Sequence, residues 1–427
     1  MTRTAYTLLI YLLLPFTPIK LLWRGRKQPE YRQHWAERYG FYSFTMQKPV
    51  IWLHCVSVGE TRAAAPLVKA LLLNYPHHQI LLTHSTPTGR AASESIFGDG
   101  LYGNRVAKAY LPFDAPFAVK NFLTHFKPVL GVLMETELWF NLIAGCQQEG
   151  VPLLLVNARL SEKSALGYAK LGQLVRAGLQ SLTAIAAQTE ADAKRLQYLS
   201  GRKPIHITVT GNLKFDMQVP PSTFAHGQQL RELFDKERLV FMAASTREGE
   251  EIMILNAVAA ISCHEFLTVI VPRHPQRFNE VEALLQQRSL PYQKRSDLKQ
   301  PLLASTRYVL GDSMGELFDY YAACDIALVG GSLQPFGGQN LIEAAMLGKP
   351  VLVGVHTYNF MDATNEAIAA GAVIQVKNVA DLQQKITLLL DNSSLRAQMG
   401  AAGLQFSQAA TGATAKIMKL INAFLMA

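Results

Sequence analysis

The fold of this chain is decided by one stretch, IALVGGSLQPFGGQNLIE (residues 326–343). It predicts a strand over 326–329, a glycine-rich turn, and a helix from Ile342 to Leu347. Glycines let backbone N–H groups approach a ligand, and the first turn of a helix offers unpaired donors and partial positive charge. An anion fits there, with Asn340 near the helix cap and Glu343 placed to accept from sugar hydroxyls. An ordinary strand–loop–helix connection, with Glu343 favourably placed in the helix dipole, explains the same residues.

Apolar runs of this kind alternate with helix-like segments along most of the chain. The strands they predict are 50–56, 79–83, 109–111, 129–134, 152–156, 184–187 and 207–209, then 239–243, 266–271, 308–310, 326–329, 351–353 and 373–375. Repeated βα units indicate parallel sheets covered on both faces. Residues 217–223 contain a proline pair without periodicity and read as a linker. We therefore expect two facing, Rossmann-like, doubly wound α/β domains that bind ligands at the carboxyl ends of their strands.

Length and composition narrow the possible functions. A chain of 427 residues needs two or three domains, and 49% hydrophobic against 17% charged residues excludes disorder. The four cysteines (Cys55, Cys146, Cys263 and Cys324) form no CxxC pair, which indicates neither a zinc site nor a disulfide framework and fits a reducing compartment. A net charge of +9 suits an anionic membrane or a phosphorylated substrate. Nucleic acid is not favoured, because no binding signature for it is present.

The N-terminus predicts a membrane anchor. Residues 5–19 are almost wholly apolar, and a basic cluster follows, made of Lys20, Arg24, Arg26, Lys27 and Arg32. The apolar run is shorter than the roughly 20 residues of a bilayer span, and a signal peptide carries its basic residues in front. Basic residues stay on the cytoplasmic face and attract anionic lipid. We expect an anchored protein with its body in the cytoplasm; a buried first helix of a soluble domain is the alternative.

Three strand ends in the first half carry charged side chains. Glu60 follows the first strand at a helix start, where a carboxylate can act as a general base or simply cap the helix. Glu135 and Glu137 end the fourth strand, and because a buried unpaired carboxylate is costly, one of them should contact a cation or substrate. A capping box for the next helix is the alternative. Lys214 suits the charge of a leaving phosphate, although a lone lysine is commonly a surface residue.

Four strand-end loops in the second half carry groups suited to a nucleotide or anion. They hold Ser245 and Thr246; Arg273 and His274; Met314, Gly315 and Glu316; and Gly331, Ser332, Asn340, Leu341, Ile342 and Glu343. Prolines fix the turn around Arg273 and His274, and arginine suits bidentate phosphate contacts. Carboxylates and a lysine in the first half, with anion binders in the second, indicate a two-domain glycosyltransferase whose donor binds the C-terminal half and whose acceptor binds the N-terminal half.

These motifs resemble the 3-deoxy-D-manno-oct-2-ulosonic acid (Kdo) transferase family of lipid A biosynthesis. The resemblance is carried by residues 57–60, 135–139, 157–161, 211–216, 272–275 and 330–332. It implies a GT-B fold, CMP-Kdo as donor, a lipid A precursor as acceptor and no metal. It also implies Glu60 as the catalytic base, with Glu135 and Lys214 supporting the transition state. CMP would be held by Arg273, His274, residues 314–316 and residues 340–343.

The resemblance further implies the reaction and its place in the cell. Kdo would move with inversion to the 6′-hydroxyl of a tetraacylated precursor, lipid IVA, as the first step of lipopolysaccharide core assembly. The enzyme would sit on the cytoplasmic face of the bacterial inner membrane, on anionic lipid. We expect an anchoring segment at 1–28, an acceptor domain at 29–218, a donor domain at 223–405, and a helix at 406–427 packing back on the N-terminal domain. A UDP-sugar transferase or epimerase of the same fold, or a non-catalytic nucleotide-sugar-binding membrane protein, stays open as an alternative.

Overall fold

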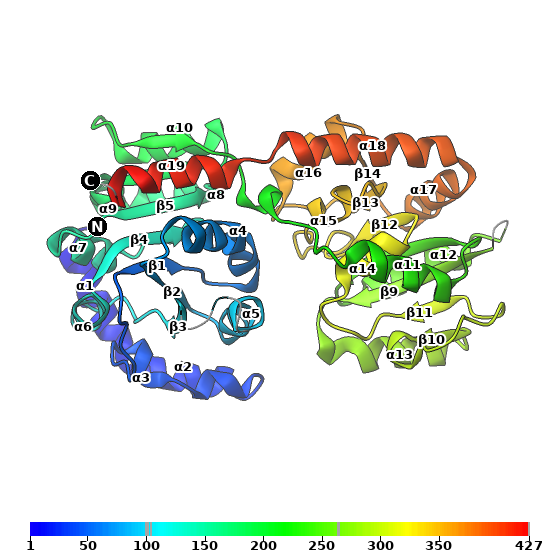
Figure 1. The fold of residues 1–427 in the computed structure, drawn as a ribbon, viewed down its shortest axis with the longest axis horizontal. Helices are drawn as coiled ribbons and strands as arrows, with labels where there is room; N and C mark the ends of the chain where they lie inside the picture. The colour runs from blue at the N-terminus through cyan, green and yellow to red at the C-terminus, as the bar shows by residue number, and fades with distance from the viewer. Residues whose placement is uncertain (99–101, 103–104, 263–264, 426–427) are drawn as a thin grey trace. The chain divides into compact units, whose positions relative to one another are not determined.

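The computed structural model describes residues 1–98, 102, 105–262 and 265–425, and the chain divides into two compact units. Unit 1 comprises residues 1–217 with 410–427, and unit 2 comprises residues 218–409. Each unit is built on a parallel sheet of seven strands (Figure 1). The prediction of two doubly wound α/β domains is therefore confirmed. Cys263 lies outside the described residues; Cys55, Cys146 and Cys324 are buried free thiols.

Unit 1 has the strand order β3-β2-β1-β4-β5-β6-β7. Its strands are β1 (Val50–His54), β2 (Gln79–His84), β3 (Val106–Tyr110), β4 (Pro128–Met134), β5 (Leu153–Ala158), β6 (Ala184–Ala187) and β7 (Ile207–Val209). Alternate side chains of each strand enter the two apolar clusters that lie on the two faces of the sheet. The chain order reverses between β1 and β4, which makes the carboxyl ends of these two strands the switch point where open α/β sheets bind ligands.

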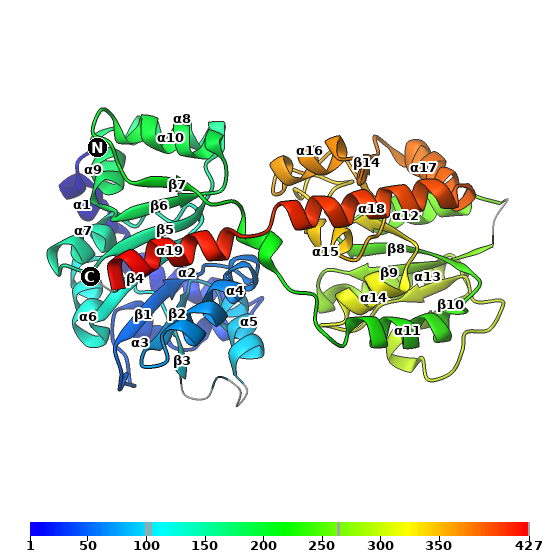
Figure 2. The ribbon, with the colours of Figure 1, turned by 45° about the horizontal axis from the view of Figure 1, so that its top comes forward.

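Helices cover both faces of the unit 1 sheet, as Figure 2 shows. They are α4 (Val58–Asn74), α5 (Pro87–Phe97), α6 (Pro116–Phe126), α7 (Phe140–Gln148), α8 (Glu162–Leu171), α9 (Gln173–Ser181), α10 (Glu190–Ser200), the 3₁₀ turn η4 (Leu213–Asp216) and α19 (Ala413–Leu425). The last of these returns from the far end of the chain. Ala413, Ile417 and Ile421 of α19 are fully buried in the same apolar cluster as α4. Asp216 accepts hydrogen bonds from the backbone N–H groups of Gly412 and Thr414, which fixes the start of α19.

The N-terminal segment forms a nearly continuous helical rod on unit 1. It consists of α1 (Arg3–Leu13), η1 (Leu14–Phe16) and α2 (Thr17–Arg24), and leads through η2 (Pro29–Arg32) to α3 (Trp35–Arg38). Within the described part of the chain, residues 3–24 are the one helical segment whose length and apolar composition would suffice to cross a membrane. Only 6% of its most apolar window is buried inside the protein, so it is not a core helix. A buried first helix is thereby excluded.

Unit 2 has the strand order β10-β11-β9-β8-β12-β13-β14. The strands are β8 (Leu239–Thr246), β9 (Phe266–Pro272), β10 (Tyr292–Lys294), β11 (Tyr308–Leu310), β12 (Ile326–Val329), β13 (Val351–Val353) and β14 (Val373–Gln375). The helical segments are α11 (Thr223–Phe234), α12 (Glu250–Ala259), η5 (Pro275–Arg277), α13 (Phe278–Gln287), η6 (Arg295–Asp297), α14 (Leu317–Ala323), α15 (Ile342–Ala345), α16 (Met361–Ala369), α17 (Val379–Asp391) and α18 (Ser393–Ala409). Here the chain order reverses between β8 and β12.

Two helices differ from the predicted ones. The helix expected from Ile342 to Leu347 ends at Ala345, because Gly348 follows with a φ of 64° and turns the chain toward β13. A four-residue helix has little dipole, so the partial positive charge expected from it is largely absent. The helix predicted at 406–427 is broken at Gly412, whose φ of 106° favours glycine, so that α18 ends at Ala409 and α19 begins at Ala413. This break separates α18 in unit 2 from α19 in unit 1.

Candidate functional site

Glu60 lies at the switch point of unit 1, in the first turn of α4. The backbone N–H of Val56, just after β1, donates to its Oε2 at 2.8 Å. The hydroxyl of Ser57, the N-cap residue, donates to its Oε1 at 3.0 Å. Glu60 therefore does belong to the capped first turn of α4, where its own N–H donates to the Ser57 hydroxyl at 3.4 Å. The two bonds to its carboxylate fix that group in one orientation at the carboxyl edge of the sheet.

The surroundings of Glu60 favour its protonated form. Burial is the largest cause, the charge of Glu135 is the second, and together with Glu137 they raise the pKa of Glu60 to about 7 against the lowering effect of its two hydrogen bonds. The residue is only 8% exposed. A carboxyl with this pKa is partly ionised at neutral pH and can take up a proton efficiently there, as a general base must.

Glu135 and Lys214 form an ion pair beside this carboxyl. Glu135 follows β4 directly with a φ of 58°, a backbone conformation that is strained for glutamate. The Nζ of Lys214, on η4, lies 3.5 Å from the Glu135 Oε1, and the lysine side chain is 13% exposed. Lys214 is thus a largely buried, paired cation rather than a solvated surface lysine. The four charged residues predicted in unit 1, namely Glu60, Glu135, Glu137 and Lys214, are thus brought together.

The helix that follows Glu135 and Glu137 is capped by a different residue. Asp114, which is 3% exposed, accepts from the backbone N–H groups of Asn141 at 3.0 Å and Leu142 at 2.8 Å in the first turn of α7. Glu135 and Glu137 are therefore not needed for a capping box, which was the alternative reading of these carboxylates. Burial raises the pKa of Asp114 to about 6.

Two asparagines that are not among the predicted site residues hold the turn that presents Lys214. Asn157, fully buried at the end of β5, has a φ of 54°, and its Oδ1 accepts from the N–H of Leu213 at 2.9 Å. The Oδ1 of Asn212 accepts from the N–H of Lys214 at 3.0 Å. The available signal was an amide side chain at the end of an otherwise apolar strand, since a buried amide must find partners.

In unit 2 the ends of β8 and β12 approach each other closely at the switch point. A Cβ on Gly330 would lie 2.6 Å from the carbonyl oxygen of Ser245, so only glycine fits. Ser245 has a φ of 56° and is 7% exposed. The hydroxyl of Thr246 donates to Glu251 at 2.6 Å, and Glu251 in turn pairs with Arg277. The Thr246 side chain is therefore engaged inside the unit.

The glycine-rich loop already holds an anion, which is a side chain of this protein. Glu250, fully buried, accepts from the backbone N–H groups of Gly331 at 2.6 Å and Leu333 at 2.9 Å. It also accepts from Arg247 N–H at 2.8 Å. Ser332 is internal too: its hydroxyl donates to a β12 carbonyl and accepts from Gly354 N–H at 2.8 Å. We expected these loop donors to face a ligand, whereas two of them shape the loop instead. Glu250 lies 81 positions before Gly331, so no local sequence pattern indicates it as the partner of this loop.

Arg273 and His274 follow β9, and the backbone of Arg273 is fixed by a hydrogen bond to Thr246 O at 3.0 Å. Partial burial and the cations Arg247 and Arg273 lower the pKa of His274, so it is neutral at pH 7. Arg273 and Glu343 both act on buried Tyr321: burial is the main cause that raises the Tyr321 pKa, Glu343 adds to it and Arg273 opposes it. The arginine and the glutamate predicted for donor binding thus both lie near Tyr321.

Residues 312–316 form a rigid loop after β11, supported by η6. Arg295 Nη2 donates to Glu316 Oε1 at 2.8 Å, and Ser313 Oγ donates to the other oxygen of Glu316 at 2.5 Å. Ser296 donates to Asp312 through both its N–H, at 2.8 Å, and its hydroxyl, at 2.6 Å. These bonds leave Met314 exposed at the tip of the loop, beside Gly315 with its φ of 87°. The backbone there is open to a ligand.

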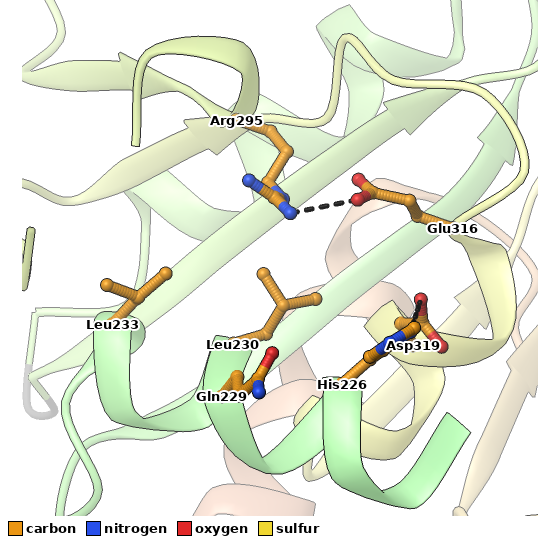
Figure 3. A pocket seen from close by; sticks show the side chains of 7 residues that line it. All are labelled: His226, Gln229, Leu230, Leu233, Arg295, Glu316 and Asp319. Atoms are coloured by element: carbon orange, nitrogen blue, oxygen red, sulfur yellow. Dashed lines mark hydrogen bonds and ion pairs between the residues drawn. The ribbon is translucent and has the colours of Figure 1, made fainter. Parts of the chain in front are cut away.

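Figure 3 shows the pocket behind this loop, of about 230 Å³. Arg295 and Glu316 face each other across its upper side, and His226 from α11 pairs with Asp319 from α14 at 3.3 Å. Arg295 therefore connects the loop to η6 and lines this pocket together with residues of α11 and α14. Nothing in the sequence singled out this arginine, because its partner lies 21 positions away.

Asn340 and Glu343 are joined at the start of α15. The Oδ1 of Asn340 accepts from Ile342 N–H at 3.2 Å, and its Nδ2 donates to Glu343 Oε1 at 3.2 Å. Leu341 and Ile342 are buried and position the turn. Among the described residues, no group of three or more His, Cys, Asp or Glu side chains is arranged to hold a metal ion.

Two parallel sheets with polar groups at both switch points define a two-domain glycosyltransferase of the GT-B class. A glycosyltransferase from Rickettsia africae ESF-5 shares this fold: the match covers 89% of this chain and 99% of that chain with a TM-score of 0.60, at 13% identity. The model of glycosyl transferases group 1 matches residues 290–406.

The sequence comparisons identify the family within this class. The model described as 3-Deoxy-D-manno-octulosonic-acid transferase (kdotransferase) matches residues 33–217. A 3-deoxy-D-manno-octulosonic acid transferase of Bordetella pertussis is 39% identical over the full length of both chains. One from Haemophilus influenzae is 36% identical over 100% of this chain and 99% of the relative. The chain belongs to the Kdo transferase family and is a glycosyltransferase.

Proposed function

We propose that this enzyme transfers Kdo from CMP-Kdo, with inversion, to the 6′-hydroxyl of a tetraacylated lipid A precursor, lipid IVA. Unit 1 binds the acceptor and unit 2 binds the donor. The observation that carries the proposal is the oriented, buried carboxylate of Glu60 beside the Glu135–Lys214 pair in a chain of the Kdo transferase family. Glu60 takes the proton from the acceptor hydroxyl, whose oxygen attacks C2 of Kdo as the bond to CMP breaks.

The remaining predicted residues serve the charge that builds up on the leaving phosphate. Lys214 and Arg273 are the cations we assign to it, since fixed cations stabilise developing negative charge without reorganisation. Arg273 and His274, residues 314–316 and residues 340–343 are proposed to hold CMP. Thr246, Gly331 and Ser332 shape that site through the internal bonds described above, and Ser245 shapes it through the close approach of its carbonyl to Gly330. The enzyme would act at the cytoplasmic face of the inner membrane, where anionic lipid attracts its basic N-terminal segment.

The test is incubation of the full-length enzyme with CMP-Kdo and lipid IVA, followed by mass spectrometry of the lipid. A product heavier by one or more Kdo residues supports the proposal, and the anomeric configuration of the new bond tests inversion. UDP-sugars serve as the matched donors, because turnover with them and not with CMP-Kdo would favour the rival UDP-sugar transferase. CMP-Kdo binding without any lipid product would favour a non-catalytic protein.

A further inference from the structure

The N-terminal rod of unit 1 has one strongly apolar outer face. Its most exposed large side chains are Leu8 (66%), Leu12 (68%), Phe16 (60%), Ile19 (63%) and Trp23 (64%). Their spacing of three or four residues places all five on one side of the helix. Apolar patches of this kind on an otherwise polar surface mark contact with a partner or a membrane.

The opposite face of the rod is fastened to unit 1 by polar side chains. The hydroxyl of Tyr6 donates to the buried carboxylate of Asp114 at 2.8 Å, and the hydroxyl of Thr7 donates to the Oδ1 of Asn141 at 2.8 Å. Further along, the Thr17 and Tyr39 hydroxyls are 2.8 Å apart. The rod is therefore part of the folded unit over most of its length, from α1 into α2.

We propose that residues 3–24 do not cross the bilayer but lie flat in the interface of an anionic membrane, with the Leu8–Trp23 face immersed. This deepens the proposed function, since it rests on the membrane association given there. Spanning would withdraw Tyr6 and Thr7 from Asp114 and Asn141 and leave polar groups without partners, which is costly in hydrocarbon. A length sufficient for spanning does not decide the question, because interfacial helices are often as long.

The charge of the segment identifies the partner as an anionic lipid surface. Exposed Lys20, Arg24, Arg26 and Lys27 cluster at the end of the apolar face, next to Trp23. Lysine and arginine stems can lie along apolar surface while their charges reach phosphate headgroups, and tryptophan prefers the same depth. A second copy of this chain would present the same cations and be repelled at this end.

The rod also leads directly to the edge of the sheet that carries Glu60. After α2 the chain passes through η2 and α3 to Arg38, whose Nη1 donates to the carbonyl of Ser85, just beyond β2, at 3.2 Å. The neighbouring Thr86 donates to Val56 O at 2.8 Å, and Val56 N–H holds Glu60. A flat rod thus fastens the carboxyl edge of this sheet to the lipid surface that contains the acceptor.

The orientation can be measured in the full-length enzyme bound to vesicles. An environment-sensitive fluorescent amino acid replaces one residue at a time, at Leu8, Leu12, Phe16, Ile19 or Trp23. Its depth in the bilayer is measured from its quenching by lipids that carry a quencher at known acyl positions. The proposal predicts one shared depth, about 5–10 Å below the headgroups, for all five positions. Depths that reach the bilayer centre near Leu12 and become shallow toward both ends would establish a spanning helix and overturn it.

Flotation with phosphatidylethanolamine vesicles, with and without phosphatidylglycerol, tests the partner. We expect Leu12→Ser with Phe16→Ser to lower partitioning at least ~10-fold per residue, and Leu73→Ser, a control at an 81% exposed leucine of α4, to leave it unchanged. Arg24→Glu with Lys27→Glu should remove the preference for phosphatidylglycerol. An unchanged preference would overturn the electrostatic part. The apolar face could instead join two copies of the chain. The proposal as a whole would be overturned if the protein is a dimer, and if Leu12→Ser with Phe16→Ser dissociates this dimer without lowering flotation.

Transfer of Kdo to detergent-dispersed acceptor is measured in parallel. Wild-type enzyme that binds vesicles flat but lacks this activity would contradict the proposed reaction and leave the interfacial rod supported. Active enzyme whose N-terminal helix spans the bilayer would support the proposed reaction and contradict the interfacial rod. The two proposals can therefore fail separately.

Discussion

Replacement of Glu60 by glutamine should separate its chemical role from its structural one. Because the pKa of Glu60 is raised to about 7, kcat/KM of the wild-type enzyme should rise with pH along a limb centred near 7 and level off above it. Glu60→Gln should lose at least ~100-fold in kcat/KM at pH 8 and lose this limb. Glu135→Gln should move the limb to lower pH, since the Glu135 charge is the second cause of the raised pKa.

The same carboxyl should reduce the stability of the protein. Raising its pKa from 4.5 to about 7 means that the folded state holds a proton that the unfolded chain releases. Stability therefore falls as pH rises between these two values, by about 3 kcal/mol in total, and stays low above 7. At pH 8, Glu60→Gln should regain the stability that ionisation of Glu60 removes, reduced by about 1 kcal/mol because one hydrogen bond is weakened. At pH 4 the gain should vanish.

The assay combines pH–rate profiles between pH 5 and 9 with thermal melts of wild type and Glu60→Gln at pH 4 and pH 8. We expect the melting temperature of the variant to exceed that of wild type at pH 8 only. A wild-type kcat/KM that does not vary with pH would refute the role of Glu60 as a titrating base. The difference in melting temperature, variant minus wild type, should be larger at pH 8 than at pH 4. A smaller difference at pH 8 would refute the burial argument.

Two further predictions concern unit 2. Glu250→Gln should destabilise this unit by ~2–4 kcal/mol in denaturant titrations, because glutamine cannot satisfy three backbone N–H donors, two of which are buried, and a loss below 1 kcal/mol would contradict this. Arg295→Ala should raise the KM for CMP-Kdo about 10-fold with little change in kcat, since it loosens the loop that holds Glu316, and Arg295→Lys should restore part of it. Arg307→Ala, which breaks an exposed ion pair, is the matched control; equal effects of both alanines would count against a role for the loop.

Most of the fold followed from apolar runs. Every predicted strand is present, since buried parallel strands are nearly continuous in Val, Ile, Leu and Ala. The additional strand is β10, residues 292–294, whose sequence Tyr-Gln-Lys has no apolar run because it lies at the edge of its sheet. The return of α19 to unit 1 depends on packing of Ile417 and Ile421, a long-range contact that no local pattern encodes.

The candidate site was predicted less completely than the fold. Strand-end positions located Glu60 and Glu135, because topology alone brings the ends of β1 and β4 together. Lys214 follows the edge strand β7 and reaches Glu135 only through the turn that Asn157 and Asn212 hold. The sequence does not show which side chains form hydrogen bonds or ion pairs with the predicted site residues. Glu250 accepts from backbone N–H groups of the glycine-rich loop, 81 residues away in the sequence. The sequence of that loop alone predicts that the same N–H groups bind a ligand. Tertiary hydrogen bonds of this kind become apparent only in three dimensions.

The discontinuity of unit 1 has a consequence for biosynthesis. Ile417 and Ile421 complete the core around α4, yet they leave the ribosome only after the whole of unit 2. The unit that carries the proposed base is therefore unfinished while the whole of the other unit is being made. In the nascent chain, the apolar surface of α4 stays uncovered while unit 2 is synthesised, until α19 packs on it. Premature termination near residue 410 would yield a complete second unit joined to a first unit with an open core.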